Sequence, residues 1–289
     1  MKVICDKRCI IGEGPVWNEE ENLLYFINAY GNEICMLDIY TGKMRVRQIK
    51  GGVSAIAFDK DMRLIVSRTD GIYYLSSDNT MEALYDTLQY CILRGNDMKV
   101  GPDGRLYVGT QSGKRCGASD QVDGKLYSID TAGRVRVLLD GLTLSNGLEW
   151  SMDEKKFYHT DSDTCLIKEY DFDKASGNIT YTGRQVRVDG VDGFTMDQKN
   201  RILAPCWGKG HMAVINSNTM EIETYMDIPS KIPVSCGFAG KEMEYLAVVT
   251  ASRGVDLKQD INAGFTYLYK YPSRGRKPYR FGNQGGKFI

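Results

Sequence analysis

Six polar residues stand at matching places before six short apolar runs of the chain, and their types suit the binding of a cation or a small polar ligand. Each lies 10 or 11 residues before the start of its run. In chain order they are Glu13, Ser54, Asn96, Asn146, Asp192 and Ser235. If the chain repeats one structural unit, equivalent positions gather around a common axis, and we expect these side chains to form a ring.

Two carboxylates in this ring, Glu13 and Asp192, would repel each other. At about 4 Å the repulsion is about 4 kcal/mol for an effective dielectric constant of about 20. A proton on one carboxyl group relieves it by raising that pKa, but a divalent cation cancels both charges. Oxygen ligands favour Ca²⁺, Mg²⁺ or Mn²⁺, and Zn²⁺ also accepts them. The alternative is that the ring only hydrogen-bonds to channel water.

The elements that must position these residues follow from the repeat. The apolar runs begin at residues 40, 42, 51, 45 and 44 positions apart, namely Leu24, Leu64, Leu106, Phe157, Ile202 and Leu246. A polar turn such as DKDMR, GPDGR or DQKNR precedes each run, and further strand-like stretches follow. Six repeats of about four short strands, without helical periodicity, predict an all-β six-bladed β-propeller with a central metal-binding channel.

The two ends of the chain carry separate expectations. No Pro-rich or Gly/Ser-rich linker interrupts the series, so we expect residues 1–289 to form a single domain. The segment from Val3 to Cys5 precedes the first repeat and is predicted to pair with the last one, near residues 265–271, which hides both sheet edges. The tail over residues 272–289 is rich in Lys, Arg and Gly and is expected to be a solvated, loose end.

Composition excludes several classes of function. Lys plus Arg and Asp plus Glu both total 37, so the formal net charge is zero and neither nucleic acid nor an anionic membrane is an expected partner. With only two histidines, a three-histidine metal site cannot form. There is neither an apolar run of membrane-spanning length nor the apolar segment of a signal peptide, so we expect a cytoplasmic protein.

Eight cysteines are scattered singly along the sequence. Cys5 and Cys9 form the one close pair, and no second pair matches it at metal-ligand spacing. Most cysteines lie in or beside apolar runs. We therefore expect buried or half-buried free thiols in a reducing compartment.

Five spaced segments carry a family resemblance that extends over nearly the whole chain. They are GEGPVW at 12–17, RGNDMKVGPDGRLYVGT at 94–110, SNGLEWSMDEKKFYHTDS at 145–162, VDGFTMDQKNRI at 191–202 and CGFAGKEMEYLAVVTASRG at 236–254. Their order and sequence resemble those of the regucalcin (senescence marker protein) and gluconolactonase family. That resemblance implies a six-bladed propeller that holds a divalent cation in its channel and hydrolyses sugar lactones.

The resemblance also assigns roles by motif. It implies metal ligands at Glu13 of GEGP, Asn146 of SNGL and Asp192 of the DG turn, with Ca²⁺ as the first expected cation. It implies that Arg94 and Asn96 contact the substrate. The chain departs from animal lactonases between Thr110 and Asp123, where a longer acidic segment is replaced, which leaves the substrate undetermined.

The expected reaction is the hydrolysis of a small lactone, with the cation polarising the carbonyl group and activating water. Asp192 is the expected general base, although a cation-bound carboxylate is a weak base, and metal hydroxide could attack while Asp192 only guides the proton. Two alternatives remain open: a related propeller phosphotriesterase, and a cation-binding propeller without turnover. The sequence leaves the oligomeric state undetermined.

Three other residue types near the motifs are expected to be structural. His159 follows Tyr158 in a strand and is predicted to be packed or hydrogen-bonded. Trp17 and Trp150 stand at matching offsets after Glu13 and Asn146, which indicates repeated core packing. Asp97 is expected to support its neighbours, because adjacent strand residues point to opposite faces.

Overall fold

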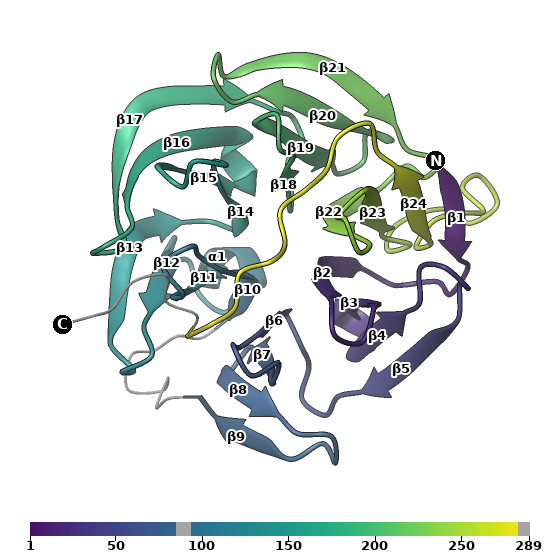
Figure 1. Ribbon diagram of the computed structural model, residues 1–289, viewed down its shortest axis with the longest axis horizontal. Helices are drawn as coiled ribbons and strands as arrows, with labels where there is room; N and C mark the ends of the chain where they lie inside the picture. Colours follow the sequence, from purple (N-terminus) through teal and green to yellow (C-terminus); the bar gives the residue numbers. More distant parts are fainter. Residues whose placement is uncertain (85–93, 283–289) are drawn as a thin grey trace. The chain divides into compact units, whose positions relative to one another are not determined.

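The computed structural model describes residues 1–84 and 94–282 of the chain. Its strands form six four-stranded antiparallel sheets, most of them built from consecutive strands (Figure 1). Six such sheets in chain order confirm the predicted fold class, a six-bladed β-propeller. The chain divides into two compact units, the first containing Met1–Val53 and Gln185–Lys277 and the second Ser54–Arg184 and the segment that begins at Pro278. A single domain over residues 1–289 stays a prediction.

The first unit contains three sheets. One consists of β2 (Gly12–Asn18), β3 (Leu23–Asn28), β4 (Glu33–Leu37) and β5 (Met44–Gln48), with the 3₁₀ turn η1 (Ala29–Gly31) after β3. The second consists of β18 (Thr195–Met196), β19 (Arg201–Cys206), β20 (His211–Asn216) and β21 (Glu221–Asp227). The third consists of β22 (Pro233–Ala239), β23 (Tyr245–Thr250), β24 (Thr266–Lys270) and β1 (Lys2–Cys5).

The second unit contains the other three sheets. One consists of β6 (Ala55–Phe58), β7 (Leu64–Arg68), β8 (Gly71–Leu75) and β9 (Met81–Ala83). The next consists of β10 (Gly95–Val100), β11 (Leu106–Thr110), β12 (Gly124–Ile129) and β13 (Val135–Leu142), with the short helix α1 (Gly113–Cys116) after β11. The last consists of β14 (Ser145–Trp150), β15 (Lys156–Asp161), β16 (Leu166–Asp173) and β17 (Asn178–Arg187), which ends just beyond the unit boundary; the 3₁₀ turn η2 (Ser162–Thr164) follows β15.

The N-terminal strand β1 completes the sheet of the last repeat. It pairs antiparallel with β24, where Lys2 faces Leu268 and Val3 faces Tyr267. This confirms the predicted pairing of the chain's beginning with residues near 265–271. The pairing covers an edge of β24 that would otherwise present unpaired backbone groups.

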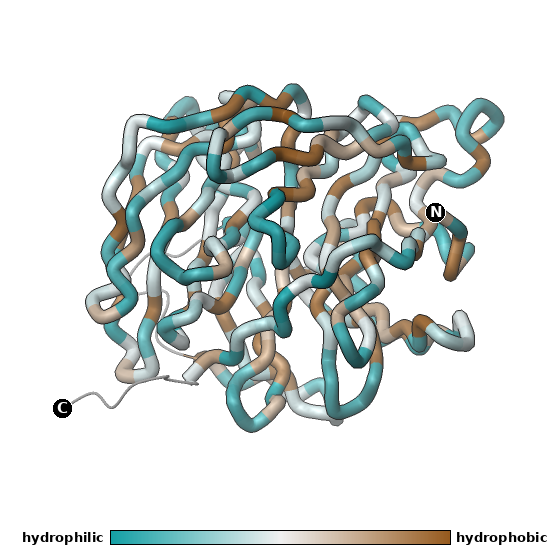
Figure 2. Tube along the Cα trace, turned by 45° about the horizontal axis from the view of Figure 1, so that its top comes forward, coloured by the Kyte–Doolittle hydropathy of each residue, from teal (hydrophilic) through white to brown (hydrophobic). Residues whose placement is uncertain are grey.

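Apolar side chains within the strands form the cores of both units, while hydrophilic residues concentrate in the turns (Figure 2). Trp17 and Trp150 are 1% and 0% exposed, which confirms their predicted place in the core. In the second unit the Trp150 ring lies 4.9 Å from that of Tyr107 and 5.0 Å from that of Phe157, between ring centroids. Edge and tilted contacts of this kind add to the stability that burial provides.

The tail was predicted to be loose, and for residues 278–282 that prediction is wrong. The Phe281 N–H donates to Phe58 O at 3.0 Å, and Phe281 O accepts from Lys60 N at 2.9 Å. Phe281 is buried in the core of the second unit, and the Arg280 guanidinium lies over the Phe58 ring. The prediction relied on the basic composition of the tail and overlooked Phe281, an aromatic residue that anchors it. Residues 283–289 lie outside the described part of the chain.

The cysteines largely follow the prediction of free, buried thiols. Five of them are buried and form no disulfide with another described residue, namely Cys5, Cys9, Cys35, Cys206 and Cys236. Cys165 is half-buried and Cys116, at the end of α1, is exposed. Cys91 lies outside the described residues. No helix within residues 1–84 and 94–282 combines the length and apolar character needed to span a membrane.

Candidate active site

The six polar residues of the repeat lie in or just before the first strand of their sheets. Glu13, Asn96 and Asn146 are each the second residue of the strand, in β2, β10 and β14. Ser54 immediately precedes β6, and Ser235 lies inside β22. Asp192 stands in the loop before β18, which begins three residues later at Thr195.

Four of these first strands are irregular near the polar position. The register shifts between Glu13 and Val16, between Gly95 and Met98, between Asn146 and Leu148, and between Pro233 and Ser235. A β-bulge bends a strand and redirects a side chain, and bulges are common beside functional sites. Glycine supplies the required backbone conformation at Gly14 (φ +55°) and Gly147 (φ +43°), directly after Glu13 and Asn146.

Arg94 is held by Asp123, at the end of the segment over residues 110–123. Its NH2 group donates to Asp123 Oδ2 at 2.9 Å, and the N–H of Gly113 donates to Asp123 Oδ1 at 2.7 Å. The hydrogen bond from Arg94 lowers the pKa of the Asp123 carboxyl group. The Nε atom of Arg94 is buried and makes no hydrogen bond within the described residues. Asp123 therefore orients the guanidinium.

Asn96 joins two neighbouring sheets of the second unit. Its Nδ2 donates to Ser145 O at 3.1 Å, and its Oδ1 accepts from Gln111 Nε2 at 3.2 Å. Asn146, the residue after Ser145, donates from Nδ2 to Ser162 Oγ at 3.2 Å and is 3% exposed. Asn96 thus bonds to the backbone of the residue that precedes Asn146. Gln111 had no signal in the sequence and is placed only by the fold.

Asp97, the residue after Asn96 in β10, also contacts β14. Its carboxylate accepts from the N–H of Met98 at 2.8 Å and from that of Gly147. Removal from water raises its pKa, and attraction to Lys99 opposes that rise. These contacts fix the backbone next to Asn146 and fit a supporting role.

His159 is packed against the start of β14, as predicted. Its Nε2 lies 2.8 Å from Ser145 Oγ, and its ring is 2% exposed. Burial, together with the nearby charge of Lys168, lowers the pKa of His159 to about 3. The ring is therefore neutral in the folded protein at physiological pH.

In the first unit, Asp192 lies between two glycines, Gly190 and Gly193, that allow close packing around it. Its N–H donates to Pro205 O at 3.3 Å, and its side chain is 7% exposed. A Cβ atom on the next residue, Gly193, would lie only 2.6 Å from Ser235 Oγ, so glycine allows the sheets that contain β18 and β22 to approach here. Gly190, at φ +80°, accepts from the N–H of Trp207 at 2.6 Å.

The expected residues are thus divided between the two units, with Glu13 and Asp192 in the first and Arg94, Asn96 and Asn146 in the second. Among residues 1–84 and 94–282, no group of three or more His, Cys, Asp or Glu side chains is arranged to hold a metal ion. The predicted set has a different make-up, two carboxylates and an amide. Such hard oxygen donors fit a cation such as Ca²⁺ or Mg²⁺.

Asn28, which precedes η1, plays a structural part. Its Oδ1 accepts from the N–H of Ile10 at 2.8 Å and its Nδ2 donates to Glu33 Oε2 at 2.8 Å. Glu33 in turn pairs with Lys7 at 2.9 Å. An aspartate at position 28 would place a second negative charge against Glu33, so an amide suits this site.

Residues 11–252 match the family described as the SMP-30/gluconolactonase/LRE-like region. The chain belongs to this family. The match covers the first four segments that carried the resemblance and all but the last two residues of the fifth, and it includes every expected site residue. Membership in the family, together with its relatives, indicates a lactonase-type function on a propeller.

Relatives of known name are similar over almost their whole length. The chain is 29% identical to a Bacillus subtilis (strain 168) protein named as a candidate sugar lactone lactonase, YvrE, over 96% of each chain. It is 27% identical to regucalcin of Gallus gallus, over 97% of this chain and 98% of that protein. The crystal structure of a calcium-binding protein, regucalcin, from Agrobacterium tumefaciens str. C58 superposes with a TM-score of 0.86, at 20% identity and 96% coverage of each chain. That similarity supports the fold.

Proposed function

We propose that this protein hydrolyses a small lactone, with a sugar (aldono)lactone as the substrate class, and that it does so with one divalent cation. Family membership over residues 11–252 carries the proposal. The donor chemistry of Glu13, Asn146 and Asp192 at the beginnings of the first strands supports it. A small lactone is the only partner that this function requires.

The cation would be held by Glu13, Asn146 and Asp192. We propose Ca²⁺, with Mg²⁺, Mn²⁺ or Zn²⁺ as other occupants of the same oxygen set. When bound, it polarises the lactone carbonyl and lowers the pKa of a water molecule. The charges of Glu13 and Asp192 balance those of the cation, which also removes the cost of two facing carboxylates.

The chain's own groups supply proton transfer and orientation. Asp192 accepts a proton from the attacking water as the water oxygen bonds to the carbonyl carbon. The ring C–O bond then breaks, and the proton is delivered to the departing alkoxide, so an open hydroxy acid leaves. Arg94, already oriented by Asp123, donates to substrate oxygens and stabilises negative charge on the carbonyl oxygen. Asn96 orients the substrate at the edge of β10.

The test compares Asp192→Ala with Ser54→Ala, two substitutions at equivalent places in the repeat. Activity on five- and six-membered sugar lactones is followed by pH-stat, and bound metal by elemental analysis. Asp192→Ala is expected to lower kcat/KM by more than about 100-fold, because it removes a ligand, a negative charge and a proton acceptor. Ser54→Ala removes only a hydroxyl group that donates to Ser67 Oγ at 3.0 Å, so activity should fall by less than about threefold.

Other outcomes distinguish the alternatives. An Asp192→Ala protein with stoichiometric metal and near-normal turnover would overturn the assignment of the site. Hydrolysis of organophosphates but not of lactones would establish a phosphotriesterase. Tight metal binding without hydrolysis of either panel would establish a cation-binding propeller. Treatment with a chelator and re-addition of each metal identifies the cation that restores activity.

A further inference from the structure

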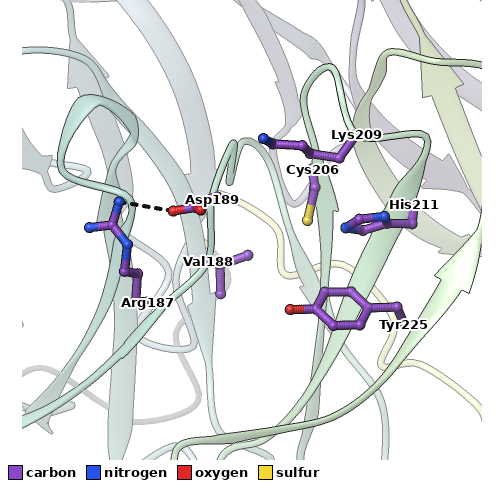
Figure 3. A pocket seen from close by; sticks show the side chains of 7 residues that line it. All are labelled: Arg187, Val188, Asp189, Cys206, Lys209, His211 and Tyr225. Atoms are coloured by element: carbon purple, nitrogen blue, oxygen red, sulfur yellow. Dashed lines mark ion pairs between the residues drawn. The ribbon is translucent and has the colours of Figure 1, made fainter.

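A pocket with a volume of about 470 Å³ opens in the first unit, on the sheet that contains β19, β20 and β21 (Figure 3). Its size lies within the range of small-molecule sites. Cys206 ends β19, Lys209 lies in the turn that follows, and His211 begins β20. Tyr225 comes from β21, so three consecutive elements of one sheet build most of the wall.

The polar groups of this pocket are mainly donors. Arg187 and Asp189 form an ion pair at 2.9 Å, which uses the one carboxylate that lines the pocket. The N–H of Lys209 donates to Cys206 O at 3.1 Å, whereas its ammonium group makes no hydrogen bond or ion pair with any described residue. The pocket therefore has one more cation than carboxylate, and its ammonium group calls for an anionic ligand or water.

The floor and one wall are apolar or aromatic. Val188 and Cys206 are 2% and 1% exposed. Burial raises the pKa of the Cys206 thiol to about 11, so the thiol stays neutral and acts as a small apolar surface. The His211 and Tyr225 rings meet edge to face with centroids 4.6 Å apart, and both project beside the thiol (Figure 3). A ligand with an apolar body would find contacts here that an inorganic anion would not use.

We propose that this pocket binds a small organic carboxylate, with its charged end at Lys209 and its apolar body on Val188 and Cys206, against the His211–Tyr225 pair. The Tyr225 hydroxyl points toward Val188, away from Lys209, and supplies a donor at the other end of the ligand (Figure 3). None of Glu13, Asn146 and Asp192 lines this pocket, so the proposed site uses other residues than the proposed reaction centre. The inference does not depend on lactonase activity.

Isothermal titration calorimetry of the full chain tests it with benzoate as the probe, and with inorganic phosphate as a probe that has charge but no apolar body. Benzoate should bind saturably and more tightly than phosphate. Lys209→Ala should weaken benzoate binding by roughly tenfold, as expected for the loss of a charged hydrogen bond. Added salt should weaken binding to the wild type, because the cations at the pocket mouth are exposed.

Lys199→Ala is the matched control. Lys199 is an exposed lysine of the same sheet, but it lies in the turn between β18 and β19, whereas Lys209 follows β19. The control should bind benzoate as the wild type does. Equal weakening in both variants would show nonspecific charge attraction and overturn the proposal. Absence of saturation at tens of millimolar benzoate, or tighter binding of phosphate than of benzoate, would also overturn it.

Discussion

Asp197 and Asp97 belong to opposite ends of their sheets. Asp197 lies in the turn between β18 and β19, is 0% exposed and pairs with Arg201, its Oδ2 accepting from Arg201 Nε at 2.8 Å. Its Oδ1 also accepts from the N–H groups of Lys199 and Arg201. Asp97 lies near the beginning of β10 and accepts from Gly147 in the neighbouring sheet, and burial raises its pKa.

Asp197 therefore has a local role within its turn, whereas Asp97 makes a long-range contact. The turn aspartate finds all these partners within four residues, and the same pairing recurs at Asp59 with Arg63 and at Asp130 with Arg134. Asp97 instead supports a backbone position fifty residues away in the sequence. We infer that carboxylates at the turns stabilise single hairpins, whereas those at the strand beginnings serve the site.

The largest expected effect is on stability at a turn. Asp197→Ala should lower the free energy of unfolding by about 3 kcal/mol, because it leaves two backbone N–H groups and a partly buried guanidinium without their acceptor. Urea denaturation measures it. The control is Asp61→Ala, which removes an exposed carboxylate paired with Lys60 at 2.9 Å and should change stability by less than about 0.5 kcal/mol. Equal losses would contradict the special role of the buried turn aspartate.

The second prediction concerns how folding stability depends on pH through His159, which packs against the start of β14. The lowered pKa of His159 means that the unfolded chain takes up a proton between about pH 6.5 and pH 3 and the folded chain does not. This contribution to stability is present above pH 6.5 and is lost as the pH falls, by about 2 kcal/mol between pH 7 and pH 5. The free energy of unfolding is measured by denaturation at both pH values. His159→Gln should abolish this part of its decrease at low pH, whereas His211→Gln should leave the decrease unchanged.

The third prediction contrasts the two aspartates directly. Asp97→Asn should change stability by less than about 1 kcal/mol, since it removes a charge that burial disfavours. Lactone hydrolysis should fall by about 10- to 100-fold, because the backbone beside Asn146 loses a charged acceptor. Asp197→Asn should lower stability by more than Asp97→Asn does and leave lactone hydrolysis nearly unchanged. If Asp97→Asn destabilised the protein and left kcat/KM unchanged, the inference that turn carboxylates stabilise hairpins and strand-start carboxylates serve the site would be wrong.

The smallest effect is expected at Arg94. Asp123→Asn weakens the ion pair that orients the guanidinium, so KM for the lactone should rise by about three- to tenfold with kcat less affected. Initial rates across substrate concentrations measure both parameters. The control is Asp120→Asn, an exposed carboxylate in the same segment. A KM that stays unchanged in Asp123→Asn would show that Arg94 does not contact the substrate.

Much of the fold could be predicted from the sequence. The spacing of the apolar runs placed one hairpin in each repeat, and the polar turns between first and second strands lie where DKDMR and DQKNR predicted them. The positions of Glu13, Asn96 and Asn146 followed from the same spacing, because a repeat transfers a strand position from one sheet to the next. Asp192 shares the offset although its backbone is a loop.

The sequence by itself determined what depends on neighbours along the chain: strand periodicity, turn composition and the pairing of an aspartate with an arginine four residues later. Only the tertiary structure decided that Asp123 orients Arg94, that Gln111 bonds to Asn96, that Phe281 anchors the tail and that Lys209, His211 and Tyr225 line one pocket. These contacts join segments whose separation no local pattern encodes. They form because apolar and backbone contacts elsewhere in the chain bring the segments together, and that cooperative packing is a property of the whole fold.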